Sequence, residues 1–191
     1  FLHSVTAGAV KPPAGYSEAK TRSLLDSYTP EDIPKEKKVD IIAIQLEAFA
    51  DFSLFEGVEG VDFERAYGVY HQLEAESVAG NLVTNIFAGG TVDTERAFLT
   101  GFADQRNYRA NTNSYAWELR GQGYTAEGCH PSYEWFYNRR NVNGYLGVPT
   151  YYFIENRFRE LYPHGEAPEE VLFPEILRLY EENRDIGGAP Y

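Results

Sequence analysis

An apolar run from Val39 to Leu46, rich in isoleucine, gives a clear strand pattern in the first part of the chain. A continuous apolar segment of this length is typical of a parallel strand that is covered on both faces. We therefore predict a central buried strand over residues 39–46. Glu47 follows directly, so the sequence predicts a carboxylate at the carboxyl end of that strand.

From Thr91 onward, apolar residues recur with the period of an α-helix. A helix is predicted from Thr91 to Gly101, with Thr91 capping its first turn and Gly101 ending its last. An amphipathic helix is predicted over Pro168–Asn183, with Pro168 near its first turn. Further helices are predicted over Thr112–Gln122 and Tyr133–Tyr145, and strands over Tyr124–Cys129 and Thr150–Phe153.

The alternation of strands and helices predicts an α/β fold with a mainly parallel central sheet flanked by helices. Ligands of such sheets bind beyond the carboxyl ends of the strands, where Glu47 and the segment after Cys129 fall. The domain is predicted to occupy residues 39–191. Residues 1–38 are polar and contain several prolines, and we interpret them as a linker or lead-in segment with one short helix over Ser17–Tyr28.

The composition narrows the possible classes of function. The 191 residues, 43% of them hydrophobic, suffice for one domain with a core. A net charge of -12 argues against nucleic-acid binding, because no basic patch is available for a phosphate backbone. The 15 Tyr and 12 Phe suit surfaces that contact sugars or glycerol, and Cys129 alone excludes an internal disulfide framework. Residues 187–191 resemble the start of another element, so we expect the chain to be part of a longer protein.

Glu47 and Thr91 are the first candidates for chemistry. A carboxylate at a strand end and a hydroxyl at a helix N-terminus can share a metal ion, which would activate the hydroxyl as a nucleophile toward a phosphate ester. The N-terminus of the helix favours phosphate, and Gly89 and Gly90 allow its close approach. Taken singly, each residue favours a simpler interpretation: Glu47 as a surface residue that ends the strand, and Thr91 as an ordinary helix cap.

The segment His130–Arg140 combines a histidine, several aromatic residues and two arginines after a predicted strand. Arginine binds phosphate through a planar fork, and aromatic rings can cover glycerol or a sugar. The alternative is the aromatic start of a core-facing helix with solvated arginines. Cys129–Tyr133 partly matches the Cys-x-Pro-x-Arg pattern that yields formylglycine in sulfatases, but the final Arg is missing and we reject that assignment. His3, His71 and His164 lack ligand spacing and are expected to be structural or solvated.

Read in order, the motifs resemble the lipoteichoic acid synthase family, which are phosphoglycerol transferases of the sulfatase and alkaline-phosphatase superfamily. The motifs are Ile44–Phe49, Gly89–Glu95 and the segment that runs from Gly123 through His130 to Arg139. The resemblance covers roughly residues 39–191 and implies an alkaline-phosphatase/sulfatase-like α/β fold, truncated in this chain. It also implies that residues 1–38 correspond to the linker between membrane-spanning helices and an extracellular catalytic domain, so the complete protein is expected to be anchored in the cell membrane.

Position by position, the resemblance implies that Glu47 and Thr91 are ligands of one divalent metal, Mn²⁺ or Mg²⁺, and that Thr91 is the nucleophile. It implies that His130, Tyr137 and Arg139 bind the phosphoglycerol group, with Tyr137 standing where the family more often has Trp. An Asp-His pair and a further substrate His of the family are expected beyond residue 191. Residues 1–191 alone are therefore expected to be inactive.

The resulting hypothesis is a transfer of glycerol phosphate from the head group of phosphatidylglycerol to a glycerophosphate polymer or a glycolipid, through a covalent intermediate on Thr91. Two alternatives stay open at this point. One is a phosphodiesterase or sulfatase of the same superfamily, which would use water as the acceptor. The other is a non-catalytic module that binds a cell-wall polymer.

Overall fold

The computed structural model describes residue 12 and residues 14–28, 31–46, 49–83, 90–103 and 107–184. These residues fall into two compact units, one ending at Lys37 and one beginning at Lys38. The first unit contains helix α2 (Glu18–Asp26) and the short 3₁₀ helix η1 (Lys35–Lys37). Ser17 caps α2 because its hydroxyl accepts a hydrogen bond from the backbone N–H of Lys20. The short helix predicted in this region is thus confirmed.

The second unit begins with two helical elements that the sequence analysis did not predict, η2 (Phe52–Leu54) and α3 (Phe63–Glu76). Asp51 connects these two elements. Its carboxylate accepts a hydrogen bond from the backbone N–H of Ser53 and pairs with Nε2 of His71 in α3 at 2.5 Å. The hydrogen bond between the two side chains raises the pKa of His71 and lowers that of Asp51. His71 therefore has a structural partner, as expected for a histidine outside any ligand pattern.

The sheet of the second unit consists, within the described residues, of two short parallel strands, β1 (Glu127–Cys129) and β2 (Thr150–Tyr152). Gly128 is opposite Tyr151 in the register of this pair. The chain is therefore an α/β protein with a small parallel sheet. The larger central sheet and the sulfatase-like fold stay predictions.

The strand predicted over residues 39–46 is wrong for this structure, which has no strand in that range. The apolar side chains of Val39, Ile41 and Ile44 are exposed. A strand forms only where another strand accepts and donates its backbone hydrogen bonds, and neither β1 nor β2 pairs with this segment. The apolar pattern indicated a buried segment. A strand also needs a neighbouring strand to pair with, and the pattern gives no information about that partner.

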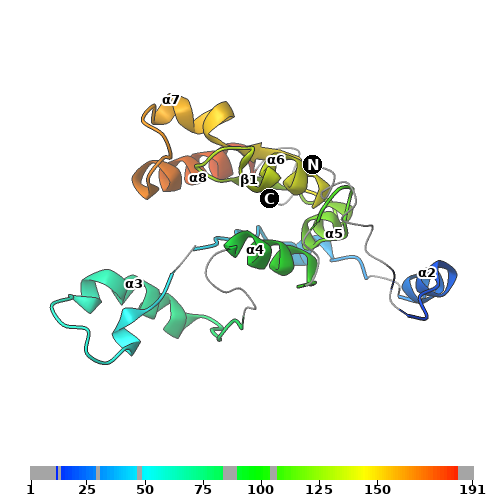
Figure 1. Ribbon diagram of the computed structural model, residues 1–191, viewed down its shortest axis with the longest axis horizontal. Coiled ribbons are helices and arrows are strands. Elements are labelled where there is room, and N and C mark those ends of the chain that lie inside the picture. The colour runs from blue at the N-terminus through cyan, green and yellow to red at the C-terminus, as the bar shows by residue number, and fades with distance from the viewer. Residues whose placement is uncertain are drawn as a thin grey trace, which may run out of the picture. The chain divides into compact units, whose positions relative to one another are not determined.

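The helices after residue 90 agree more closely with their predictions. Helix α4 covers Thr91–Thr100 and ends at Gly101, which has a left-handed backbone with φ 68°. Helix α8 covers Glu169–Asn183, with Pro168 at its cap. The other elements are α5 (Tyr115–Gly121), the 3₁₀ turn η3 (Phe136–Asn138), α6 (Arg139–Tyr145), the π-helical turn η4 (Ile154–Phe158) and α7 (Arg159–Leu161). Figure 1 shows α6, α7 and α8 around β1.

Two apolar clusters form the core around the sheet. One contains Tyr108, Val142 and Leu146, and the other contains Ile154, Phe158 and Ala167. Gly147 has φ 89° and lies so close to Trp117 that a Cβ atom would sit 2.9 Å from the indole ring. The indole Nε1 donates to the carbonyl of Tyr145 at 2.8 Å. This close contact fixes α5 against the end of α6.

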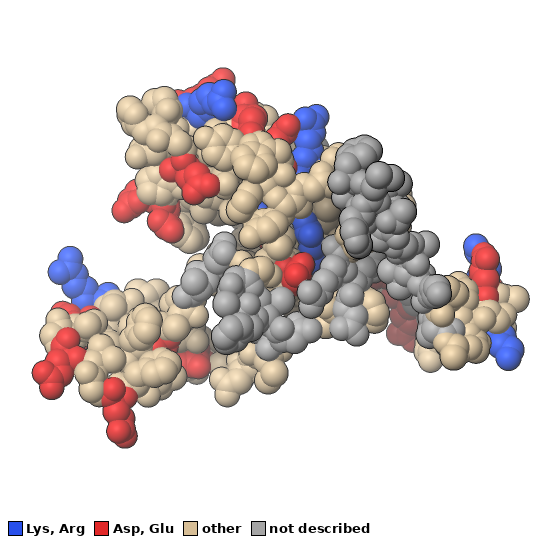
Figure 2. All heavy atoms as spheres, in the orientation of Figure 1, with Lys and Arg blue, Asp and Glu red and all other residues tan. Residues whose placement is uncertain are grey.

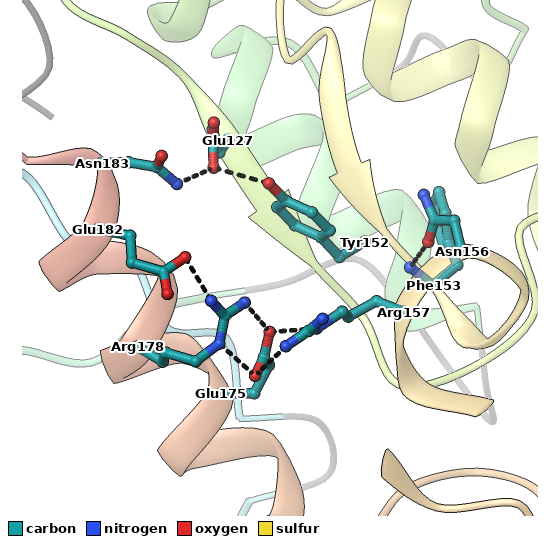
Figure 3. A network of polar contacts seen from close by, with 9 residues as sticks. All are labelled: Glu127, Tyr152, Phe153, Asn156, Arg157, Glu175, Arg178, Glu182 and Asn183. Carbon is teal, nitrogen blue, oxygen red and sulfur yellow. Dashed lines mark hydrogen bonds and ion pairs between the residues drawn. The ribbon is translucent and has the colours of Figure 1, made fainter. Parts of the chain in front are cut away.

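Helix α8 is joined to the segment after β2 by an ion-pair network around Glu175, shown in Figure 3. The Glu175 side chain is only 4% exposed, and its carboxylate accepts from Arg178 at 2.6 and 2.9 Å and from Arg157 at 2.5 and 3.0 Å. Hydrogen bonds from Arg178 and then Arg157 lower the pKa of Glu175 to about 2. The guanidinium groups of Arg157 and Arg178 each donate two charge-assisted hydrogen bonds, and these keep the carboxylate ionised.

The variant Glu175→Gln is expected to lower the free energy of unfolding at pH 7 by about 3 kcal/mol, as follows from the size of the pKa shift. Because the pKa is lowered by folding, this stabilisation is present above the unfolded-state value of 4.5 and is lost as the pH falls toward 2. Urea unfolding at pH 7 and pH 3 measures both effects. The control is Glu182→Gln, which removes an exposed partner of Arg178 and should lower the free energy of unfolding by less than about 1 kcal/mol. Equal losses of stability in the two variants would contradict a stabilising role for the buried Glu175 carboxylate.

Charge is distributed over several separate places in the structure. On the face drawn in Figure 2, Asp and Glu side chains lie in distinct groups, with Lys and Arg side chains scattered among them. The absence of a nucleic-acid partner, argued from the net charge of -12, stays a prediction. Among the described residues, no helix combines the length and the apolar character needed to cross a bilayer.

Candidate functional site

The candidate nucleophile Thr91 is the first residue of α4. The sequence analysis placed Thr91 at the cap position, but the structure gives that position to Gly90, which has a left-handed backbone with φ 78° and ψ 27°. Glycine adopts this conformation without the steric cost that threonine would meet. Gly90 has no side chain to cap the helix, and Thr91 is partly exposed at a helix N-terminus, where the macrodipole favours an anion.

Glu95 connects the start of α4 to the segment around Arg139. It lies one turn after Thr91 on the same side of the helix, because residues four apart are neighbours on a helix surface. Its carboxylate pairs with Nη1 of Arg139 at 2.5 Å, and the two side chains are 17% and 6% exposed. The structure therefore brings Arg139, 48 positions after Thr91 in the chain, against the side of α4 that carries Thr91 at its N-terminal end.

Arg96 provides a second connection between α4 and the same segment. Its Nη2 donates to the backbone carbonyl of Tyr137 at 2.6 Å, and its guanidinium lies 5.6 Å from the ring centre of Tyr108. Burial lowers the pKa of Arg96, whereas the charge of Glu95 opposes that shift. Two consecutive residues of α4 thus bind the backbone and a side chain of the segment 137–139.

The segment bound by Arg96 contains an uncommon backbone conformation. Tyr137 (φ 57°, ψ 19°) and Asn138 (φ 56°, ψ 33°) are both left-handed, and they interrupt the helix that the sequence predicted over residues 133–145. Such residues cost on the order of 1 kcal/mol each and are retained where surrounding contacts enforce them. Here Arg96 holds the carbonyl of Tyr137, and the amide of Asn141 donates to the side chain of Asn138 at 2.7 Å.

The turn leaves a row of aromatic side chains exposed. Trp135, Phe136 and Tyr137 all face solvent, and neighbouring rings lie 5.7 and 4.2 Å apart. The guanidinium of Arg139 lies 5.9 Å from the ring centre of Tyr137. The sequence-predicted substrate residues Tyr137 and Arg139 are therefore neighbours, with one exposed and the other buried beside α4.

His130 lies at the carboxyl end of β1, where its backbone N–H donates to the carbonyl of Tyr152 at 2.9 Å. This is the edge of the parallel sheet at which ligands bind in α/β folds. Glu47, the predicted metal ligand, lies outside the described residues. The structure thus brings Tyr137 and Arg139 against α4, whose first residue is Thr91, and places His130 at the sheet edge.

Three buried polar atoms near α6 have no hydrogen-bond partner within the described part of the chain. They are Oη of Tyr108, Nε of Arg139 and Nδ2 of Asn143. An unpaired buried donor is costly, so such atoms mark places where a water molecule or a ligand oxygen fits. Of these three atoms, Nε of Arg139 is the one that suits a phosphate oxygen. Glu95 pairs with Nη1 of the same guanidinium and not with Nε.

The donors for a metal ion are only partly visible in the structure. The hydroxyl of Thr91 and the carboxylate of Glu47 are oxygen ligands of the kind that Mg²⁺ and Mn²⁺ prefer. Across the ranges that the structure describes, no three His, Cys, Asp or Glu side chains gather closely enough to hold a metal. Burial raises the pKa of the Cys129 thiol to about 11, which disfavours the nucleophilic thiolate at neutral pH.

Comparison with known proteins identifies a distant relative. The chain is 27% identical over 195 aligned positions to a protein of Rhizobium meliloti (strain 1021) named "Putative cyclic beta-1,2-glucan modification protein". The alignment covers 97% of this chain and 30% of that protein, so the chain spans about a third of its relative's length. No family model and no solved structure matches the chain. The resemblance to lipoteichoic acid synthases stays a prediction.

Sequence reasoning missed the roles of Glu95, Arg96 and Tyr108. The spacing of Glu95, four residues after Thr91, was a usable signal, because it predicts one helix face for both. Nothing local identified Arg96 as the partner of a carbonyl 41 residues away. Asn138 was a weak signal for the turn, since asparagine tolerates the left-handed region better than most residues.

Proposed function

We propose that this chain is the nucleophile-bearing part of a metal-dependent phosphoglycerol transferase that moves glycerol phosphate from a phosphatidylglycerol head group to a hydroxyl of a glucan. The observation that carries the proposal is the ion pair between Glu95 and Arg139. It links the helix that begins with the Thr91 hydroxyl to a guanidinium whose Nε has no hydrogen-bond partner among the described residues. Phosphoryl transfer requires a nucleophile and groups that stabilise charge on the phosphoryl oxygens. The hydroxyl would supply the first, and the helix N-terminus and the guanidinium would supply the second.

In the first step, Oγ of Thr91 attacks phosphorus and loses its proton, the bond from phosphorus to the diacylglycerol oxygen breaks, and diacylglycerol leaves with a proton. In the second step, the acceptor hydroxyl attacks the same phosphorus, and the bond to Oγ breaks as Thr91 regains a proton. The backbone N–H groups of the first turn of α4 and Nε of Arg139 would stabilise charge on the phosphoryl oxygens in both steps. Tyr137 would cover the glycerol group.

A divalent metal, Mn²⁺ or Mg²⁺, would supply Lewis-acid activation when bound. Thr91 and Glu47 would be among its ligands. The donor lipid implies that the site works at the outer surface of the cell membrane, and the complete protein would be anchored there.

The choice of a glucan as acceptor rests on the name of the relative from Rhizobium meliloti. It replaces the glycerophosphate polymer or glycolipid suggested by the resemblance to lipoteichoic acid synthases. The exposed aromatic row over residues 135–137 supports a sugar, because aromatic faces pack well against the C–H face of a sugar ring.

The proposal is tested by incubating the complete protein with Mn²⁺ and phosphatidylglycerol, with and without cyclic β-1,2-glucan. Intact mass and peptide mapping are expected to show one glycerophosphate on Thr91, which disappears as the glucan gains glycerophosphate. Free glycerol phosphate in place of modified glucan would make the protein a hydrolase. No adduct in protein with bound metal would contradict the lipid donor.

A further inference from the structure

A second site lies beside the first turn of α6. It is an open pocket of about 330 Å³ whose lining includes Glu134, Arg140, Thr150 and Tyr151. The volume falls within the range of small-ligand sites. None of the residues assigned to phosphoryl transfer lines this pocket, so it needs an explanation of its own.

The polar part of the lining is a balanced ion pair. Nη1 of Arg140 donates to both carboxylate oxygens of Glu134, at 3.0 and 3.1 Å. The Arg140 side chain lines the pocket and is 68% exposed. The pair offers donors from the guanidinium and acceptors from the carboxylate side by side, with no net charge.

This balance decides the class of ligand. A phosphate or carboxylate ligand would approach Arg140 but meet repulsion from Glu134, and an ammonium group would meet the reverse. A neutral polyhydroxyl ligand uses both partners, because each hydroxyl both donates and accepts. The pocket therefore favours a sugar over an ionic ligand.

The apolar part of the lining consists of Pro149, Tyr151 and Phe153. Phe153 is only 1% exposed, and its ring stacks on that of Tyr151 with centres 4.8 Å apart and planes inclined by 26°. Phe153 therefore supports this wall from inside, and the exposed Pro149 and the partly exposed Tyr151 offer apolar surface to a ligand. Figure 3 shows Asn156 beside Phe153, where its amide oxygen accepts from the backbone N–H of Phe153 at 2.6 Å. Its nitrogen donates to the carbonyl of Tyr151 at 2.9 Å, so this wall is held in place before any ligand binds.

The first two residues of α6 connect this pocket to the proposed transfer site. Arg139 is buried against Glu95 of α4, whereas Arg140, the next residue, forms the pocket rim. Successive side chains on a helix point about 100° apart, so the two sites lie on adjacent sides of the same helical turn. We propose that the pocket lined by Glu134, Arg140, Thr150 and Tyr151 binds a glucose unit of the neutral glucan acceptor. This assignment rests on the proposed function for the acceptor's role, but the binding itself does not require catalysis.

The test is calorimetric titration of cyclic β-1,2-glucan into the complete protein without lipid. Arg140→Ala is expected to weaken binding by about tenfold, the effect of losing a hydrogen bond from a charged donor. Thr150→Tyr, which fills the pocket from the exposed start of β2, should weaken it at least as much. Arg22→Ala is the matched control, because Arg22 also forms an exposed ion pair, with Glu18 of α2, and should leave the affinity unchanged.

The outcomes separate this inference from the proposed function. Glucan binding that is lost in both pocket variants supports the pocket, even if Thr91 of the wild type never acquires glycerophosphate. Absence of glucan binding, or equal binding by wild type and both folded variants, overturns the pocket even if Thr91 is labelled. Displacement of the glucan by inorganic phosphate would overturn the assignment of a neutral ligand.

Discussion

Replacement of Thr91 by alanine is expected to abolish transfer in the complete protein, with a loss of roughly 10⁴-fold or more, as is found when a catalytic nucleophile is removed. The fold should be retained. Thr91 is the first residue of α4 and Gly90 is its cap, so the substitution removes no capping side chain. Steady-state transfer to the glucan and the glycerophosphate adduct measure the effect, and circular dichroism measures the fold.

Two further variants make this result specific. Thr91→Ser keeps a hydroxyl at the same place and should retain measurable turnover and form an adduct of its own. Thr94→Ala, which changes a partly exposed threonine in the same turn of α4, should remain within a few-fold of wild type. Full activity of Thr91→Ala would remove Thr91 from the mechanism, whatever the other variants do.

The variant Arg139→Gln is expected to have the second largest effect, on both activity and stability. Turnover should fall by roughly 10²–10³-fold, because the variant loses the donor that we propose for the phosphoryl oxygens. The free energy of unfolding should fall by about 3 kcal/mol, because the largely buried carboxylate of Glu95 loses its partner. Arg140→Gln is the stability control, since the side chain of Arg140 is exposed and its pair should contribute less than about 1 kcal/mol.

A double substitution separates the two roles of Arg139. Glu95→Gln combined with Arg139→Gln removes both charges and should recover most of the lost stability without recovering activity. Arg139→Lys should also remain slow, because an ammonium group cannot reproduce a planar guanidinium that pairs with Glu95 through Nη1 and carries a separate Nε donor. A double variant that regains full turnover would show that Arg139 acts only through its contact with Glu95.

The sequence predictions were correct where a structural feature depends on residues within a few positions of it. Helix α4 ends at Gly101 because a glycine with positive φ ends a helix, and α8 begins after Pro168 because proline fixes the backbone for a helix start. Both signals lie within one turn of the boundary. The prediction of a strand over residues 39–46 was wrong, because an apolar pattern does not identify the strand that would pair with it.

The sequence by itself determined the α/β character of the chain, its acidity and the positions of α4 and α8, because these depend on composition and on neighbours within a few residues. Only the tertiary structure decided that Glu95 pairs with Arg139 and that Arg96 holds the left-handed turn at Tyr137. Those contacts join residues more than forty positions apart, and periodicity carries no information at that range. The proposed site depends on them, because packing and charge pairing between distant segments position the groups that chemistry requires.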